Sequence, residues 1–295
     1  MKISIIGTNG FLSHAIAHYF ICKGNELNMY GLNEPVHMYN SFKKVDLVKE
    51  SLDYDKLCLS DLIIYAVGAG IQSNLKENNS LIYELNVTVP ITICNKLKEY
   101  NYKGTFVSFG SVFEIGNTIE ERFFTERDLL TSIAFAPNDY TISKRMLSSF
   151  VHSYQHDFKH WHFYIPTIYG EGENSTRLIP YTINAIKSGV TLSFTSGVQT
   201  RQYVYVREIP IILQKAFECS LPDGLYNIEG NETLTVKEIV HIIHQSMGLN
   251  VPEDCFGKTE RVDTGMKYLA LNGAKLFKYI QYTPICKIKD IIHNY

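Results

Sequence analysis

Apolar positions along the first 165 residues show two different spacings. Short apolar runs, which are typical of buried strands, occur at residues 2–6, 26–31, 62–66, 104–111 and 160–170, the last of which runs into a loop. Longer segments with apolar residues three or four positions apart predict helices at residues 14–24, 81–101 and 138–158. Strands that alternate with helices indicate βαβ units, and therefore a parallel sheet covered by helices on both faces.

A glycine-containing turn, GTNGFLS, separates the first predicted strand from the first predicted helix. Gly7 and Gly10 would let the backbone approach a pyrophosphate, which the N–H groups at the helix N-terminus would bind. Ser13 takes the third position of the glycine pattern and is small enough to keep helix and strand close. The alternative is a tight turn that binds no ligand. The turn therefore favours a dinucleotide site.

The pattern changes after Gly170, where loops, short strands and helices are mixed. Sheet-like segments return at RQYVYV (residues 201–206) and GLYNIEG (residues 224–230). We predict an α/β fold, a Rossmann-type doubly wound parallel sheet with a smaller mixed C-terminal substrate lobe. Residues 1–166 are expected to form the dinucleotide-binding domain, with later strands near residues 201–228 returning to it, and residues 167–295 mainly the substrate lobe.

The end of the second strand bears on the choice of dinucleotide. An acid at that position holds the adenosine ribose of NAD, whereas its absence removes repulsion toward the 2′-phosphate of NADP. The position is Gly31, in MYGLNEP, which carries no carboxylate. This favours NADP(H) over NAD(H), with Asn33, or more remotely Lys43 or Lys44, expected to meet the phosphate.

Composition and charge exclude several kinds of partner. The 295 residues carry a net charge of -2, which gives no basic excess for binding nucleic acid. The six cysteines form no Cys-x-x-Cys pair, which argues against a metal site and fits reduced thiols in a cytosol. No apolar run approaches the roughly 20 residues that span a membrane. We expect a cytoplasmic protein with no metal, nucleic-acid partner or membrane partner.

The segment NDYTISK places Tyr140 and Lys144 four positions apart. On a helix this spacing brings both side chains to one face, where they could form an acid–base pair. The same spacing often occurs by chance on a solvated helix face. The pair alone therefore does not decide between the two interpretations.

The order of these motifs resembles the extended short-chain dehydrogenase/reductase family, which acts mostly on nucleotide-linked sugars. The likeness rests on GTNGF, YAVGAG, SFGSVF and YTISK, and then on TIYGEGENSTRLIPY, GVQTRQYVYVREI, GLYNIEG and RVDTGMKYLALNGAKL. It runs from residue 1 to about residue 290. Within the family, the chain looks most like bacterial nucleotide-sugar 4-ketoreductases that make deoxysugars for surface polysaccharide, such as the CDP-abequose synthases.

The resemblance implies roles for particular residues. Tyr140 would exchange a proton with the sugar oxygen, while Lys144 would lower the pKa of the phenol and bind the nicotinamide ribose. Asn86 matches a scaffold residue of the active site. The implied cofactor-binding residues are Gly7, Asn9, Gly10, Phe11, Leu12, Asn33, Asp46, Leu47, Ala66, Val67, Gly68, Tyr140, Lys144 and Pro166. The implied contacts to a nucleotide-diphosphate sugar are Ser108, Phe109, Thr167, Arg177, Leu178, Arg201 and Arg261. A homodimer is expected by the same likeness.

One position departs from the family pattern. The residue matched to the family's catalytic Ser or Thr is Phe109, whose ring cannot hydrogen-bond a reacting oxygen. Ser111 lies two residues later on the same face of an extended strand, and Ser108 should point to the other face. We take Ser111 as the catalytic hydroxyl. Two alternatives remain open, namely a 4-epimerase or dehydratase of the same fold and a cofactor-binding regulatory or scaffold protein without turnover.

Overall fold

The protein is described by a computed structural model that covers residues 1–71, 77–259 and 265–295. Its large domain is a seven-stranded, wholly parallel sheet in the order β3-β2-β1-β4-β5-β6-β9, which confirms the predicted Rossmann-type fold. The strands are β1 (Lys2–Ile6), β2 (Glu26–Gly31), β3 (Ser41–Lys44), β4 (Leu62–Tyr65), β5 (Thr105–Ser111), β6 (Lys159–Ile165) and β9 (Gly224–Asn227).

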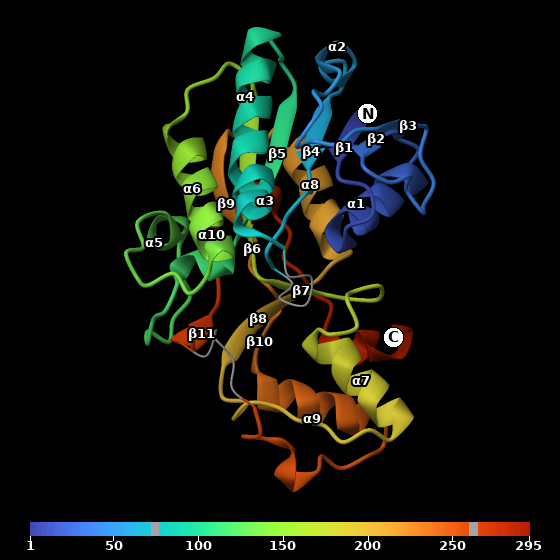
Figure 1. Ribbon diagram of the computed structural model, residues 1–295, viewed down its shortest axis with the longest axis vertical. Helices are drawn as coiled ribbons and strands as arrows, with labels where there is room; N and C mark the ends of the chain where they lie inside the picture. The colour runs from blue at the N-terminus through green and yellow to red at the C-terminus, as the bar shows by residue number, and fades with distance from the viewer. Residues whose placement is uncertain (72–76, 260–264) are drawn as a thin grey trace.

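Helices cover both faces of this sheet (Figure 1). One face packs against α1 (Phe11–Cys22) and α8 (Glu208–Glu218), and the other against α4 (Val89–Glu99) and α6 (Asp139–Ser153). The shorter helices of this domain are α2 (Tyr54–Leu57), α3 (Asn79–Tyr83), α5 (Glu126–Leu130), α10 (Ala274–Ile280), the π-turn η2 (Glu84–Thr88) and the 3-10 turn η3 (Val112–Ile115).

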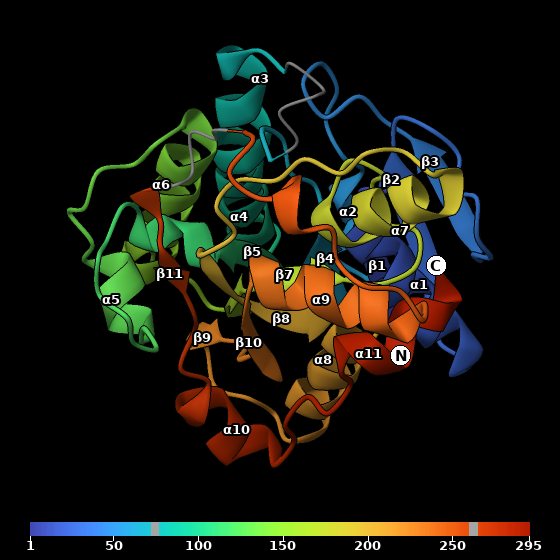
Figure 2. The ribbon, with the colours of Figure 1, turned by 90° about the horizontal axis from the view of Figure 1, so that it is seen from below.

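A second, smaller sheet forms the core of the other lobe. Its strands are β7 (Thr167–Tyr169), β8 (Thr200–Tyr205), β10 (Glu232–Thr235) and β11 (Tyr268–Leu269). Its helical elements are α7 (Leu178–Ser188), α9 (Val236–Ser246), α11 (Ile288–Ile291), η4 (Glu253–Cys255) and η6 (Ile292–Asn294). In the view from below, α7 and α9 lie in front of the large domain (Figure 2).

Several predicted elements differ in detail from the observed ones. The segment near residues 201–228 divides between the lobes, because β9 joins the large sheet whereas β8 lies in the small one. The helix that carries Tyr140 ends at Ser153 rather than at residue 158, and β6 begins at Lys159. The predicted helix at 81–101 is interrupted by η2, and Pro90 lies in the first turn of α4 directly after η2, where the Leu85 carbonyl accepts the Tyr65 hydroxyl. The edge strand β3 was not predicted.

Candidate active site

Tyr140 and Ser111 meet at the carboxyl end of the large sheet. Ser111 is the last residue of β5, and Tyr140 is the second residue of α6, whose first turn is capped by the Asn138 side chain. The Ser111 hydroxyl lies close enough to the Tyr140 phenol to lower its pKa, and both side chains are buried. The structure thus brings together two of the three residues predicted to be catalytic.

Lys144 lies one helical turn after Tyr140 on the same face of α6. Its Nζ donates a hydrogen bond of 2.8 Å to the carbonyl oxygen of Phe109 and lies 5.8 Å from the centroid of the Tyr140 ring. The predicted catalytic residues therefore form one cluster, held by β5 on one side and α6 on the other. The periodicity of α6 creates this cluster, since Tyr140 and Lys144 are both buried against the sheet.

Burial dominates the electrostatics of this cluster. It raises the pKa of Tyr140 to about 12, against the opposing effects of the nearby Ser111 hydroxyl and the Arg177 charge. The expectation that Lys144 brings this pKa below its ordinary value is therefore wrong for this structure. Burial also lowers the pKa of Lys144 to about 8, and the nearby Glu114 carboxylate opposes that shift.

The glycine turn leaves a cradle in front of α1. Gly7 has a φ of +103°, and a Cβ on it would lie 2.9 Å from Val67 Cγ2, so a larger residue would close the approach from β1 to the segment after β4. Gly10 is the N-cap of α1 and supplies no side-chain cap to the first turn, which includes Phe11 and Leu12. These residues fit a bound pyrophosphate, because the helix begins with backbone N–H groups and no competing side chain at its cap.

The loop around the cradle is held by the Asn9 side chain. Its amide donates to the Glu34 carbonyl at 2.9 Å and accepts the Val36 N–H at 3.1 Å. Asn9 thus ties the glycine turn to the segment that follows β2, where the predicted Asn33 lies exposed. In the present structure the Asn9 side chain shapes the loop rather than standing free for a ligand.

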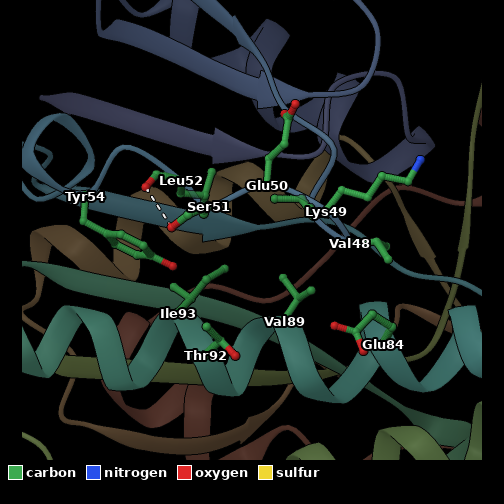
Figure 3. A pocket seen from close by; sticks show the side chains of 11 residues that line it. Val48, Lys49, Glu50, Ser51, Leu52, Tyr54, Glu84, Val89, Thr92 and Ile93 are labelled. Atoms are coloured by element: carbon green, nitrogen blue, oxygen red, sulfur yellow. Dashed lines mark hydrogen bonds between the residues drawn. The ribbon is translucent and has the colours of Figure 1, made fainter.

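A pocket of about 260 Å³ is lined by Leu47, one of the predicted cofactor-binding residues (Figure 3). Leu47 follows Asp46 in the chain, and Asp46 was predicted to match the family's acid near adenine. Asp46 accepts the Val48 N–H and pairs with Lys49 at 3.1 Å, which lowers the pKa of its carboxyl group. The pocket combines apolar side chains with a few polar ones, a chemistry that suits a flat heterocycle. It is lined by Leu47, Val48, Lys49, Glu50, Ser51, Leu52, Tyr54, Glu84, Val89, Thr92 and Ile93.

Asn86 joins the predicted cofactor segment to the catalytic helix. It is fully buried within η2, exchanges two hydrogen bonds of 2.9 Å with the backbone of Ala69, and donates to the Ser143 hydroxyl at 3.0 Å. π-turns in helices often occur at functional sites. Through this amide, the loop containing Ala66, Val67 and Gly68 is fixed relative to Lys144, which follows Ser143 in α6.

The substrate-binding residues predicted in the second lobe have different surroundings in the structure. Arg177, the N-cap of α7, pairs with Glu173 at 3.1 Å and donates to the Ile168 carbonyl, and its charge influences the pKa of Tyr140. Arg201 in β8 is buried and donates to the Thr200 carbonyl. Pro166 follows β6, Thr167 begins β7 and lies opposite Tyr203 of β8, and Leu178 packs within the small lobe. Arg261 lies outside the described residues.

Comparisons with known proteins agree with this geometry. The model of the NAD dependent epimerase/dehydratase family matches residues 3–228. The chain belongs to this family. It is 24% identical over 259 residues to a CDP-abequose synthase of Yersinia pseudotuberculosis, covering 83% of this chain and 84% of that protein.

Solved structures share the fold of this epimerase/dehydratase family member. The Bordetella bronchiseptica enzyme WbmG in complex with NAD superimposes with a TM-score of 0.80 at 16% identity, over 99% of this chain and 92% of that one. A dTDP-glucose 4,6-dehydratase from Bacillus anthracis in complex with NAD gives a TM-score of 0.82 at 16% identity, over 100% and 94% of the two chains. At these identities the likeness concerns the fold.

Two residues predicted to contact substrate lie away from the cluster. Ser108 is fully buried on the face of β5 opposite Ser111, where its hydroxyl contacts His160 at 2.8 Å and His162 at 2.7 Å. The ring of Phe109 packs in the hydrophobic core beside Phe163. Strand alternation explains the position of Ser108, and the apolar core explains that of Phe109. The structure therefore does not place either side chain against a substrate.

Gly31 has a structural role that the sequence did not reveal. A Cβ at this position would lie 2.9 Å from the Thr8 side chain, so the missing carboxylate coincides with a close approach of β2 to the glycine turn. In the register of the sheet Gly31 lies opposite Lys44 of β3, whereas Lys43 pairs with Asp53 at 3.5 Å. Of the candidate cations, Lys44 is thus the neighbour of Gly31.

Glu114 is the main residue of the site that sequence reasoning missed. It lies directly behind Ser111 and belongs to a capping box, in which its side chain accepts the Ser111 N–H. The spacing Ser-x-x-Glu at residues 111–114 is the sequence signal of such a box and could have revealed it.

In the part of the chain that the structure describes, no group of three or more His, Cys, Asp or Glu is arranged to bind a metal ion. No helix within the same residues is long and apolar enough to cross a bilayer.

Proposed function

We propose that the protein catalyses the NADPH-dependent reduction of the 4-keto group of a nucleotide-diphosphate deoxysugar. The observation that carries this proposal is the buried cluster of Ser111, Tyr140 and Lys144 at the carboxyl end of the sheet. A phenol, a hydroxyl and a cation in this arrangement can bind a carbonyl oxygen and protonate it. The CDP-abequose synthase likeness supports a sugar nucleotide as the substrate.

Each residue of the cluster has a defined task. Tyr140 donates its phenolic proton to the C4 oxygen, and Ser111 donates a hydrogen bond that stabilises negative charge developing on the phenol or on that oxygen. Lys144 is a buried cation on the same face of α6 as Tyr140, and it binds the ribose of the cofactor. The nicotinamide, when bound, supplies the hydride. Gly7 and the first turn of α1 bind the pyrophosphate, and the pocket beside Leu47 takes the adenine.

Recognition of the diphosphate is assigned to the arginines of the second lobe. Arg201 is held in β8, and Arg177 begins α7 close enough to Tyr140 for its charge to influence the phenol. A guanidinium group matches the geometry of phosphate oxygens. WbmG has been solved with NAD and UDP, and MoeE5 with UDP-glucose and NAD, so proteins of this fold accommodate such ligands.

The preference for NADPH rests on the surroundings of Gly31. No carboxylate ends β2, and Lys44 occupies the neighbouring position on β3, where a cation favours a 2′-phosphate. The structural neighbours with dinucleotides are complexes with NAD. We propose that this chain differs from them where the adenosine ribose of the cofactor binds.

Two other functions fit these residues less well. Counted from Phe109, which matches the family's catalytic position, the next residues are Gly110 and Ser111, so the Asp–Glu pair that dehydratases of this family add there is missing. An epimerase retains NAD tightly, for which an acid at the position of Gly31 would be expected. A scaffold without turnover was suggested only by Phe109, and the contact of Ser111 with Tyr140 supplies the hydroxyl that Phe109 lacks.

A screen for substrates tests this proposal. The purified protein is mixed with NADPH or NADH and with CDP-, dTDP-, UDP- and GDP-linked 4-keto-6-deoxyhexoses, and the cofactor absorbance is followed. We expect oxidation of NADPH with at least one of these sugars. Absence of oxidation with all of them, by protein that binds NADPH, would contradict the proposal.

A further inference from the structure

A fully buried carboxylate lies behind the catalytic cluster. Glu114 has no exposed surface, and its two oxygens accept hydrogen bonds from the Ser111 N–H at 2.8 Å and from the Ser148 hydroxyl at 2.6 Å. A buried charge is unfavourable unless it is paired and hydrogen-bonded. Its direct attachment to the backbone of a catalytic residue therefore points to a role in the site.

The strand next to Glu114 is shaped to admit its side chain. A Cβ on Gly110 would lie 2.6 Å from Glu114 Oε1 and 2.7 Å from His162 Nε2. Only the missing side chain at this position lets the carboxylate reach back to β5 and contact the Ser111 N–H. The short sequence from Gly110 to Glu114 thus builds the hydroxyl and the acid behind it as one unit.

The carboxylate ends a chain of buried hydrogen bonds. Ser148 contacts His162 Nε2 at 3.0 Å, His162 Nδ1 contacts Ser108 at 2.7 Å, and Ser108 contacts His160 Nε2 at 2.8 Å. Each serine has one hydrogen to donate. If Ser148 donates to ionised Glu114, His162 donates from Nε2 to Ser148, Ser108 donates to His162 Nδ1, and His160 donates from Nε2. Every donor is then used, and all of them point toward the carboxylate.

The imidazoles of this chain are neutral, so they orient the carboxylate without neutralising it. Burial lowers the pKa of His162 to about 3 and that of His160 well below its ordinary value. Cationic charge comes instead from α6. Lys144 and Arg145 both face Glu114, and Arg145 Nε donates to its backbone carbonyl at 2.6 Å. The other titratable groups that face it are the phenols of Tyr140 and Tyr164.

We propose that Glu114 is a positioning residue for the catalytic cluster, which fixes the backbone of Ser111 and acts as the buried counter-charge that keeps Lys144 protonated. The first role follows from the hydrogen bond to the Ser111 N–H. The second follows from the position of the two charged groups against β5, where Lys144 donates to the Phe109 carbonyl and the Glu114 carboxylate accepts the Ser111 N–H two residues later. The attraction between the carboxylate and the ammonium group opposes the effect of burial on Lys144. The inference deepens the proposed function, and its main test requires only cofactor binding.

The test follows the dissociation constant of NADPH against pH, by the quenching of protein fluorescence. Binding should weaken as Lys144 loses its proton at alkaline pH. Glu114→Gln removes the charge and keeps the size, so the midpoint of this loss should move about one pH unit or more toward neutrality. A merely structural role would weaken binding equally at every pH. The matched control is Glu120→Gln, a surface glutamate paired with Arg122, which should leave the midpoint in place.

Glu114→Asp separates the fixing of the Ser111 backbone from the counter-charge to Lys144. It also provides the test if Glu114→Gln does not fold. The shorter acid keeps its charge but cannot reach both Ser111 and Ser148, so the midpoint should stay within about half a pH unit of the wild type. With a sugar substrate, its kcat should fall about tenfold or more, by loss of an oriented hydrogen bond. An unchanged midpoint in Glu114→Gln, or a shifted one in Glu114→Asp, would overturn the proposal. A protein that binds NADPH but reduces no sugar contradicts the proposed function and leaves this test intact.

Discussion

The Ser111 hydroxyl lies beside the phenol of Tyr140, close enough to lower its pKa, although the two residues lie 29 positions apart in the sequence and belong to a strand and a helix. This contact places a second oxygen beside the proton donor. It also identifies which of the two nearby serines can take part in the chemistry, since Ser108 points to the opposite face of β5.

Ser111→Ala should therefore lower kcat about 10²- to 10³-fold, the loss expected when one oriented hydrogen bond to a reacting oxygen is removed. Ser108→Ala is the matched variant. It should lower the melting temperature, because it leaves buried imidazole nitrogens without a partner, while its loss in kcat should be at least tenfold smaller. Steady-state rates and thermal melts measure both effects. Equal losses of kcat in the two variants would contradict the assignment.

Lys44→Ala should weaken NADPH binding about five- to tenfold and leave NADH binding nearly unchanged, because the lysine lies opposite Gly31, where the 2′-phosphate is expected. Lys43→Ala is the control, since that lysine already pairs with Asp53. Titrations of both dinucleotides against both variants give the answer. Gly31→Asp is a poorer test, because its side chain would also collide with Thr8. Equal weakening of NADPH and NADH by Lys44→Ala would argue against a 2′-phosphate contact.

Stability should depend on pH through Glu114. Burial raises the pKa of its carboxyl group from 4.5 to about 7, so between these values the folded protein holds a proton that the unfolded chain has lost. The free energy of unfolding should then fall as pH rises from about 4.5 to about 7, by about 1.4 kcal/mol for each pKa unit of the shift. Glu114→Gln lacks this contribution, so the difference in stability between it and the wild type should change across that window.

Urea denaturation at several pH values measures this difference. Glu120→Gln provides the reference for a surface glutamate, and its difference from the wild type should stay level over the same range. A level difference for Glu114→Gln as well would mean that the carboxyl group titrates normally in the folded protein.

We also propose that the protein is a homodimer that pairs through α6. Ile142 and Met146 lie four residues apart on this helix and are 38% and 47% exposed, which leaves an apolar strip for a second copy to cover. Met146→Glu should yield a monomer in light scattering after size exclusion. Val190→Glu, at an exposed position of the other lobe, should not change the mass. A monomeric wild type would refute this part of the proposal.

The sequence predicted the fold well because local patterns determine it. The apolar runs and the turn at Gly7 and Gly10 fix β1, α1 and the parallel sheet. The spacing of Tyr140 and Lys144 likewise becomes a shared face as soon as α6 forms. These features require only the periods of strand and helix.

The features that the sequence did not predict depend on contacts between segments that are distant in the chain. The burial that raises the pKa of Tyr140 comes from the packing of α6 against the sheet, which no local pattern reveals. The close approach of Thr8 to Gly31 joins two different strand ends. Glu114 was missed because an acid three residues after a serine is usually read as an exposed helix cap, whereas here Gly110 makes room for it inside the protein.

The central claim is tested most directly by the path of the transferred hydrogen. The protein is incubated with NADPH carrying deuterium at both hydrogen positions of the nicotinamide C4 and with a nucleotide-linked 4-keto-6-deoxyhexose that proved active in the screen, and the product is examined by NMR and mass spectrometry. We predict one deuterium at sugar C4 for each NADPH oxidised, with no transfer by Tyr140→Phe, which should still bind NADPH. A product that carries solvent hydrogen at C4, or label at another carbon, or that forms without oxidation of NADPH, would contradict the assignment as a 4-ketoreductase.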